Sequence, residues 1–200
     1  SLRRLQTDRI DLYQAHQDDP DTPQDETLQA FTRLIEQGKV RIIGASNFDA
    51  DRLKSALATS EARGLARYET LQPHYNLMVR DEFESRLQPV CVARGVSVIP
   101  YFSLASGFLS GKYTRAGAPT EAARRAVFDF PPVDKERAYD IIDVMKDMGD
   151  ARGVSVAQIA LTWLLHQKHV TSVIIGAKTE AQLVDNIAAT KVELSSDDLA

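Results

Sequence analysis

The chain repeats one unit, a short apolar run followed by a helical pattern, with a period of about 30 residues. Each run is rich in β-forming side chains and ends in polar residues or glycine. Alternation of this kind predicts a parallel sheet covered by helices. The expected strands are residues 9–15, 40–43, 68–71, 96–101 and 171–175.

Helix start and stop signals occupy the stretches between these runs. Thr22 and Pro23 are typical of an N-cap followed by a first-turn proline, and Gly38 is typical of the end of that helix. Ser155 and Gln158 have the spacing of a capping box ahead of an apolar helix. Two further helices are expected at residues 49–59 and 81–93.

Two architectures contain such units, the doubly wound open sheet and the eight-stranded barrel. No G-x-G-x-x-G occurs in the sequence, and the stretch from Gly107 to Lys112 is one residue short of a P-loop. Tyr113 follows it where Mg²⁺ binding needs Ser or Thr. Polar clusters instead come directly after the strands, where a barrel builds its site, so we expect a parallel (β/α)8 TIM barrel.

The chain is short for that architecture. A complete barrel typically takes about 250 residues and eight strands, whereas this chain has 200 residues and five expected strands. Residues 1–7 resemble the tail of a helix, and Ser195 caps a helix that would stop within its first turn. We therefore expect residues 1–200 to form one incomplete barrel domain of about five strand–helix units.

Composition and charge exclude several classes of partner. Lys plus Arg number 24 against 28 Asp plus Glu, a formal net charge of −4 that provides no basic face for nucleic acid. No apolar run is long enough for a membrane span, and residues 1–11 carry charges where a signal peptide needs an apolar stretch. The single Cys91 cannot form an internal disulfide. These features favour a cytoplasmic protein that binds neither nucleic acid nor membranes.

Several histidines occur at positions that would suit a catalytic or metal-binding role. His16 closes the first expected strand, where an imidazole could hydrogen-bond a substrate oxygen or relay a proton; the alternative is a loop histidine without a role. His74 follows another strand, but the proline before it favours a structural role. His166 and His169 share a helix face without other ligands nearby, so we interpret them as a solvated helix end and expect no metal site.

Carboxamide and hydroxyl groups gather after the second and third strands. Ser46 and Asn47 follow one strand, and Gln72 and Asn76 follow the next. Such groups donate and accept hydrogen bonds, so they could hold an amide in one orientation. Ordinary turn chemistry is the alternative explanation.

Two later segments could bind anions. The stretch 101–112 combines small residues, which let backbone N–H groups approach an anion, with the charge of Lys112 and the flat ring of Tyr101. Residues 176–186 lead into a helix whose N-terminus, together with Lys178, could bind phosphate. Thr179 and Gln182 also satisfy a capping box, which explains them structurally without a ligand.

Taken in order, these segments resemble the aldo-keto reductase family across essentially the whole chain. The family is a barrel that binds a nicotinamide cofactor without a Rossmann motif, which agrees with the glycine pattern. The motifs that carry the resemblance are D-x-x-D-L-Y-x-x-H (8–16), G-K-V-R-x-I-G-x-S-N-F (38–48), Q-x-x-Y-N (72–76), L-A-S-G-F-L-S-G-K-Y (104–113) and I-I-G-A-K-T-x-x-Q-L-x-D-N (174–186).

The resemblance implies a role for each residue at the nicotinamide end of NADPH. His16 would orient the carbonyl of an aldehyde or ketone substrate, and Tyr101 would stack on the nicotinamide ring. Ser46, Asn47 and Gln72 would hold its carboxamide. The family's aspartate, its tyrosine acid and the lysine that lowers the pKa of that tyrosine would lie on strands preceding Ser1.

The rest of the cofactor would contact later segments. Phe102, Ser103, Leu104, Ala105 and Ser106 would form the pyrophosphate clamp with Lys112, although Phe102-Ser103 stands where the family usually has Ser-Pro. Near Gly176, Lys178 and Gln182 match positions that contact the 2′-phosphate of NADP. Asp185 and Asn186 match positions that bind adenine, with Asp185 where Glu is commoner.

The implied activity is hydride transfer from NADPH to the carbonyl of an aldehyde or ketone. A non-catalytic NADP-binding regulatory module, similar to potassium-channel beta subunits, is the alternative, although those subunits lack the histidine matching His16. An unrelated phosphate-binding barrel lyase or isomerase would leave the carboxamide set and the Asp185-Asn186 pair unexplained. The sequence indicates neither the carbonyl substrate nor the oligomeric state.

Overall fold

The computed structural model describes residues 1–116 and 134–199. The chain divides into two compact units. The N-terminal unit comprises Ser1–Pro73 and Asp81–Ile99, and the C-terminal unit comprises His74–Arg80 and Pro100–Ala200. Each unit has its own elements and core, described in turn.

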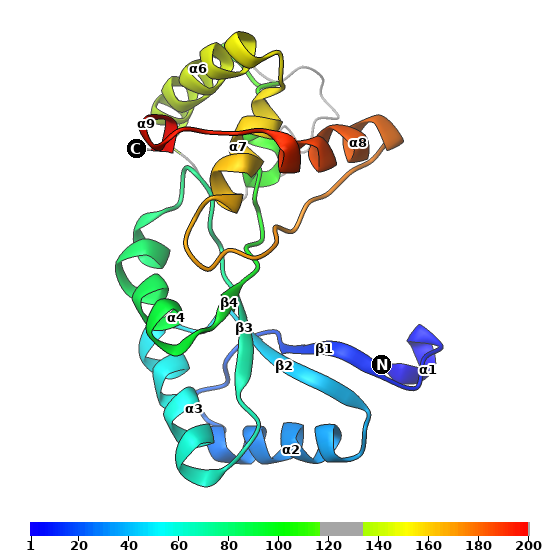
Figure 1. The fold of residues 1–200 in the computed structure, drawn as a ribbon. Coiled ribbons are helices and arrows are strands. Elements are labelled where there is room, and N and C mark those ends of the chain that lie inside the picture. Colours follow the sequence, from blue (N-terminus) through cyan, green and yellow to red (C-terminus); the bar gives the residue numbers. More distant parts are fainter. Residues whose placement is uncertain (117–133, 200) are drawn as a thin grey trace. The chain divides into compact units, whose positions relative to one another are not determined.

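A parallel sheet forms the centre of the N-terminal unit (Figure 1). The strands lie in chain order and pair in parallel, with Gln14 beside Gly44 and Gly44 beside Thr70. Four of the expected strands are thereby confirmed. Their bounds are β1 Ile10–Ala15, β2 Val40–Ser46, β3 Tyr68–Gln72 and β4 Ser97–Val98.

Helices alternate with these strands, as the repeat predicts. α2 packs against β2 and α3, and α3 packs against α4. The buried core between sheet and helices includes Leu28, Ile43, Leu53, Tyr68 and Leu71. The helices are α1 Leu2–Leu5, α2 Gln24–Glu36, α3 Ala50–Arg63, the π-helical turn η1 Phe83–Leu87 and α4 Gln88–Arg94.

The expected capping role of Thr22 is wrong. The helix α2 has Pro23 at its N-cap and no side-chain cap. The Thr22 hydroxyl instead donates to Asp19 Oδ2 at 2.7 Å, and the other Asp19 oxygen accepts from the backbone N–H of Asp21. A local aspartate turn therefore takes the hydroxyl that would have capped the helix.

The C-terminal unit is mainly helical in the residues described. Its central helix α7 packs against α6, α8, η2 and η3, and every residue from Ala157 to Leu164 is buried. None of the described helices is both long and apolar enough to cross a bilayer. The elements are η2 Ala105–Ser110, α6 Lys135–Arg152, α7 Val156–Leu165, α8 Glu180–Ala188, η3 Ala189–Lys191 and α9 Ser196–Leu199.

The fifth expected strand, residues 171–175, does not form. Only the Ile174 N–H donates to Pro100 O, at 3.0 Å, and its carbonyl accepts from the Ser103 hydroxyl at 2.8 Å. Pro100 has no N–H, so a ladder cannot continue there. The expected strand 96–101 is shortened to Ser97–Val98, and beyond it Tyr101 forms only an isolated parallel bridge with His74. The described residues are thus α/β with four parallel strands that do not close into a barrel.

Candidate active site

The N-terminal unit brings together four of the predicted site residues. His16 follows β1 directly, Ser46 ends β2 with Asn47 after it, and Gln72 ends β3. Since these strands are parallel neighbours, their carboxyl ends meet at one edge of the sheet. We call these four residues the carboxyl-edge set.

Hydrogen bonds connect the carboxyl-edge set across all three strands. The Asn47 amide Nδ2 donates to the backbone oxygen of His16 at 2.9 Å and to Ser46 Oγ at 3.3 Å. Ser46 Oγ in turn donates to the backbone oxygen of Gln72 at 3.0 Å. Asn47 has φ 55°, a left-handed conformation that asparagine tolerates better than most residues. The strand ends are therefore tied to one another by side chains.

Two groups of this set remain available to a ligand. Within the part of the chain that the structure describes, neither the His16 imidazole nor the Gln72 amide makes a hydrogen bond, and His16 is exposed. Both amide hydrogens of Asn47, by contrast, are engaged internally. Gln72 is therefore better placed than Asn47 to donate to a carboxamide, whereas Ser46 is buried and its hydroxyl already takes part in two hydrogen bonds.

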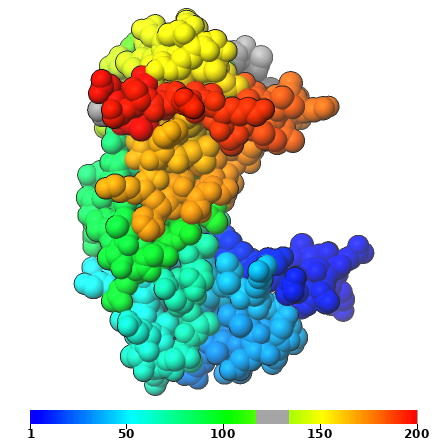
Figure 2. Space-filling view, viewed as in Figure 1, coloured from blue at the N-terminus to red at the C-terminus, as the bar shows by residue number. Residues whose placement is uncertain are grey.

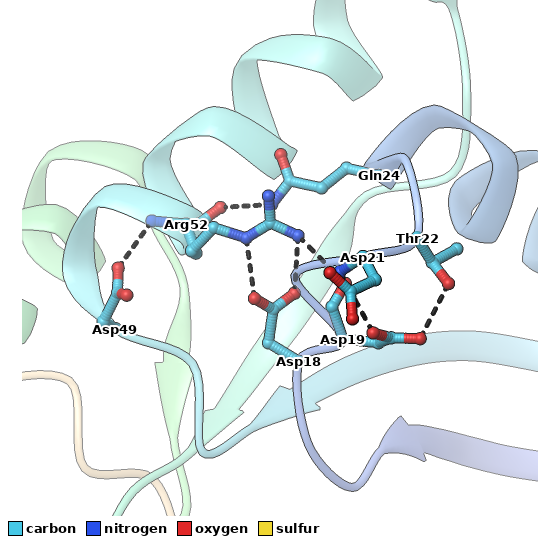
Figure 3. A network of polar contacts seen from close by, with 7 residues as sticks. All are labelled: Asp18, Asp19, Asp21, Thr22, Gln24, Asp49 and Arg52. Carbon is cyan, nitrogen blue, oxygen red and sulfur yellow. Dashed lines mark hydrogen bonds and ion pairs between the residues drawn. The ribbon is translucent and has the colours of Figure 1, made fainter.

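An ion-pair network lies beside this edge (Figure 3), and sequence reasoning missed it. Asp18, two residues after His16, accepts from Arg52 Nε at 2.7 Å and from a terminal guanidinium nitrogen at 2.8 Å. Arg52 lies in the first turn of α3. Its partner is 34 residues earlier in the sequence, so no local pattern could have paired them.

An aromatic cluster in the C-terminal unit contains Tyr101. The rings of His74 and Tyr101 stack with centroids 5.5 Å apart and an interplanar angle of 21°, and Phe102 meets His74 edge-on. Burial lowers the pKa of His74 and raises the pKa of Tyr101. His74 is therefore packed against neighbouring rings, which agrees with the structural role that its sequence position favours.

The loop after Tyr101 has an unusual backbone. Phe102, Ala105 and Ser106 all have positive φ, between 47° and 57°. The loop is anchored because Asn76 Nδ2 donates to Phe102 O at 3.0 Å and Ser103 Oγ donates to Ile174 O. A left-handed backbone conformation costs free energy in any residue other than glycine, and such residues are often found at functional sites.

Lys112 lies against the end of this loop. A Cβ placed on Gly107, which has φ 90°, would come within 3.2 Å of Lys112 Nζ, so the ammonium group sits close to the glycine backbone. Lys112 is exposed and pairs with no carboxylate among residues 1–116 and 134–199. A positive charge beside a glycine backbone that a ligand can approach closely is suited to binding an anion.

The segment leading into α8 forms the second anion candidate, at the surface of its unit (Figure 2). Thr179 Oγ1 accepts from Gln182 N–H at 3.2 Å, and Gln182 Oε1 accepts from Lys178 N–H at 2.7 Å. The cap by Thr179 is thus confirmed, but the return bond of the expected capping box goes to the N–H of Lys178 and not to that of Thr179. The Lys178 ammonium is exposed and has no ion-pair partner in the described chain, and Gly176, two residues earlier, is also exposed.

Asp185 is held by the start of α7. Ser155 Oγ donates to Asp185 Oδ2 at 2.9 Å, and Gln158 Nε2 donates to Asp185 Oδ1 at 2.7 Å. Ser155 caps Gln158 N–H as predicted, but the expected return bond of the capping box is wrong because Gln158 turns to Asp185. Asn186 beside it is buried.

Among the described residues, no group of three or more His, Cys, Asp or Glu side chains is placed to hold a metal ion. His166 places Nδ1 2.9 Å from Thr162 O at the end of α7, as expected of a helix end.

A model of the aldo/keto reductase family matches residues 1–200, the whole of the sequence. The chain belongs to the aldo/keto reductase family. Its relatives include an uncharacterized oxidoreductase, YrpG, of Bacillus subtilis (strain 168), 37% identical over 98% of this chain and 58% of that protein. The aldo-keto reductase dtxS3 of Metarhizium robertsii is 33% identical over 99% of this chain and 53% of its own length.

A relative of a different kind is also similar. A probable voltage-gated potassium channel subunit beta of Arabidopsis thaliana is 30% identical over 96% of this chain and 60% of its own length. The aldo/keto reductase chain described here therefore spans between half and three fifths of the length of these relatives.

Proposed function

We propose that the complete protein transfers hydride from NADPH to the carbonyl carbon of an aldehyde or ketone. The observation that carries the proposal is the hydrogen-bonded carboxyl-edge set in a chain of the aldo/keto reductase family. This set has an imidazole and a carboxamide that make no hydrogen bond among the described residues, and a hydroxyl, at one edge of a parallel sheet, where α/β proteins bind ligands. We further propose that the complete protein is a closed barrel in the cytoplasm.

Each member of the carboxyl-edge set has a task that its contacts permit. The Gln72 amide can donate and accept at the nicotinamide carboxamide, and Ser46 Oγ, which is buried and already in two hydrogen bonds, keeps one lone pair for it. Asn47 fixes the His16 backbone, so its contribution is as much to the position of His16 as to the cofactor. The exposed His16 imidazole is free to hydrogen-bond the substrate carbonyl oxygen. NADPH supplies the hydride when it is bound.

The C-terminal unit has groups suited to the remainder of NADPH. Tyr101 offers a ring face for stacking, and the loop from Phe102 to Ser106 with Lys112 is suited to the pyrophosphate. The exposed Lys178 ammonium is suited to the 2′-phosphate, and the amide N–H groups of Gln182, whose oxygen accepts from the Lys178 N–H, can donate to it as well. Asp185 and Asn186 would contact adenine, with Asp185 oriented by Ser155 and Gln158.

Isotope transfer tests the proposal directly. NADPH carrying deuterium at C4 is incubated with the complete protein and a panel of aldehydes and ketones. The proposal expects deuterium on the carbinol carbon of the product. Cofactor binding without transfer to any member of the panel would favour a regulatory module, as the similarity to channel beta subunits suggests. Absence of NADPH binding would reject both functions.

A further inference from the structure

We propose that Arg52 is a positioning residue, which through Asp18 fixes the loop that carries His16 against the loop that carries Ser46 and Asn47. The inference rests on the proposed function, because it assigns a purpose to the placement of His16. It concerns a contact within the N-terminal unit that none of the sequence motifs includes.

The contact between Arg52 and Asp18 has the geometry of a strong ion pair. Two guanidinium nitrogens meet the two carboxylate oxygens at 2.7 and 2.8 Å, and one of these nitrogens is also 3.4 Å from the backbone oxygen of Asp19. The side chains are only 29% and 16% exposed, so solvent screens them less than an open surface pair. A two-point fork fixes direction as well as distance.

Arg52 is itself held by both elements that it connects. Its backbone N–H donates to Asp49 Oδ1 at 2.8 Å, and Asp49 lies two residues after Asn47. Its backbone oxygen accepts from Gln24 Nε2 at 2.8 Å, and Gln24 begins α2 (Figure 3). One residue thus touches the loop after β2, the middle of the loop after β1 and the helix that follows that loop.

The loop after β1 is consequently fixed on both sides of the histidine side chain. Asn47 holds the backbone of His16, and Arg52 holds Asp18 two residues later. The His16 imidazole makes no hydrogen bond of its own in the described chain, so its direction depends on this backbone. A displacement of about 1 Å at a reacting group can cost about 10²-fold in rate. Loss of the ion pair should therefore reduce carbonyl turnover more than cofactor binding.

The chain offers a matched control. Arg63 and Asp25 also form an ion pair between α3 and α2, but both lie in these helices and outside the loops after β1 and β2. Arg63→Lys replaces a guanidinium in the same helix, at an ion pair that is more exposed and joins α3 to α2 itself. An effect that Arg52→Lys shares with Arg63→Lys is caused by changed helix packing. An effect seen only in Arg52→Lys is caused by the altered loop after β1.

The kinetic test uses the complete protein with Arg52→Lys, Arg63→Lys, His16→Ala and the double variant His16→Ala/Arg52→Lys. Arg52→Lys should lower kcat/KM for the carbonyl by roughly 10- to 100-fold with the Kd for NADPH unchanged, and Arg63→Lys should change neither. In the His16→Ala background, Arg52→Lys should cost little more. An equal loss with and without His16, or an equal loss in Arg63→Lys, would overturn the proposal.

A second measurement does not depend on activity. Backbone ¹⁵N relaxation at His16, Gln17 and Asp18 should show lower order in Arg52→Lys than in the wild type and in Arg63→Lys. Unchanged order would also overturn the proposal. If the wild-type protein reduces no carbonyl, the proposed function fails, and this readout still decides whether Arg52 fixes the loop. Should Arg52→Lys fail to fold, the isosteric Asp18→Asn replaces it in both measurements.

Discussion

The side-chain amide of Asn47 donates a hydrogen bond of 2.9 Å to the backbone oxygen of His16, a residue 31 positions earlier in the chain. The contact joins the ends of two neighbouring parallel strands, and it requires Asn47 to hold φ 55°. The residue that the family resemblance assigns to the cofactor thus also places the histidine assigned to the substrate. Backbone conformation and side-chain chemistry at Asn47 can be separated by mutation.

Asn47→Gly and Asn47→Ala both remove the amide, but only glycine adopts positive φ without strain. We expect each variant to lose about 0.5–1.5 kcal/mol of unfolding free energy with the hydrogen bond. Asn47→Ala should lose about 1 kcal/mol more than Asn47→Gly. Urea unfolding measures both values. An alanine variant as stable as the glycine variant would contradict the left-handed conformation.

Gly44 lies between two polar side chains of the sheet. A Cβ at this position would collide with Thr70 Oγ1 and approach Gln14 Oε1 to 3.1 Å. Gly44→Ala should therefore destabilise the protein by roughly 1–3 kcal/mol, and Thr70→Ala in the same chain should restore part of that loss. Gly176→Ala, where no atom lies within 4 Å of the new Cβ, is the control and should be nearly neutral. Absence of coupling between positions 44 and 70 would contradict the register.

Lys178 should distinguish the two nicotinamide cofactors. Only NADPH carries the 2′-phosphate, and a charge-assisted contact contributes roughly 1.5–3 kcal/mol, or about 10- to 150-fold in affinity. Lys178→Ala should weaken NADPH by that factor and NADH little, whereas Lys168→Ala, an exposed lysine of the same unit, should affect neither. Titration calorimetry on the wild type and both variants gives the six dissociation constants. Equal losses for both cofactors would mean that Lys178 only supports the start of α8.

His74 should make stability depend on pH. Burial lowers its pKa below the ordinary 6.5, so the folded protein binds the proton more weakly than the unfolded chain. Stability is therefore retained above the unfolded pKa and decreases as the pH falls below it, by at most about 1.4 kcal/mol per pH unit for one proton. His74→Phe, which keeps a ring against Tyr101, should reduce this slope in urea titrations at about pH 7.5 and 5.5. An unchanged slope would mean that other groups cause the pH dependence of stability.

Local signals predicted the parts of the fold that depend on neighbouring residues. Four strands follow the apolar runs, and Ser155, Thr179 and Ser195 each accept from the N–H three residues later, as their positions indicated. Because parallel strands share an edge, the meeting of His16, Ser46 and Gln72 was also predictable.

The Thr22 cap failed for a local reason, the turn at Asp19, but the other failures have tertiary causes. Residues 171–175 have the composition of a strand, but their neighbour Pro100 offers no N–H. Gln158 could have closed its capping box, yet a carboxylate 27 residues later in the chain takes its amide. The Arg52–Asp18 pair joins two loops whose sequences contain no shared pattern. In each of these cases the interaction joins segments that are far apart in the sequence and meet only in the folded chain.

The central claim is that the carboxyl-edge set directs a carbonyl toward hydride transfer, and His16→Ala in the complete protein tests it most directly. Steady-state NADPH oxidation is measured with a carbonyl substrate, and NADPH affinity is measured separately. The account predicts that kcat/KM for the carbonyl falls by about 10²-fold or more while the Kd for NADPH stays at its wild-type value. Turnover at the wild-type rate in His16→Ala would contradict it.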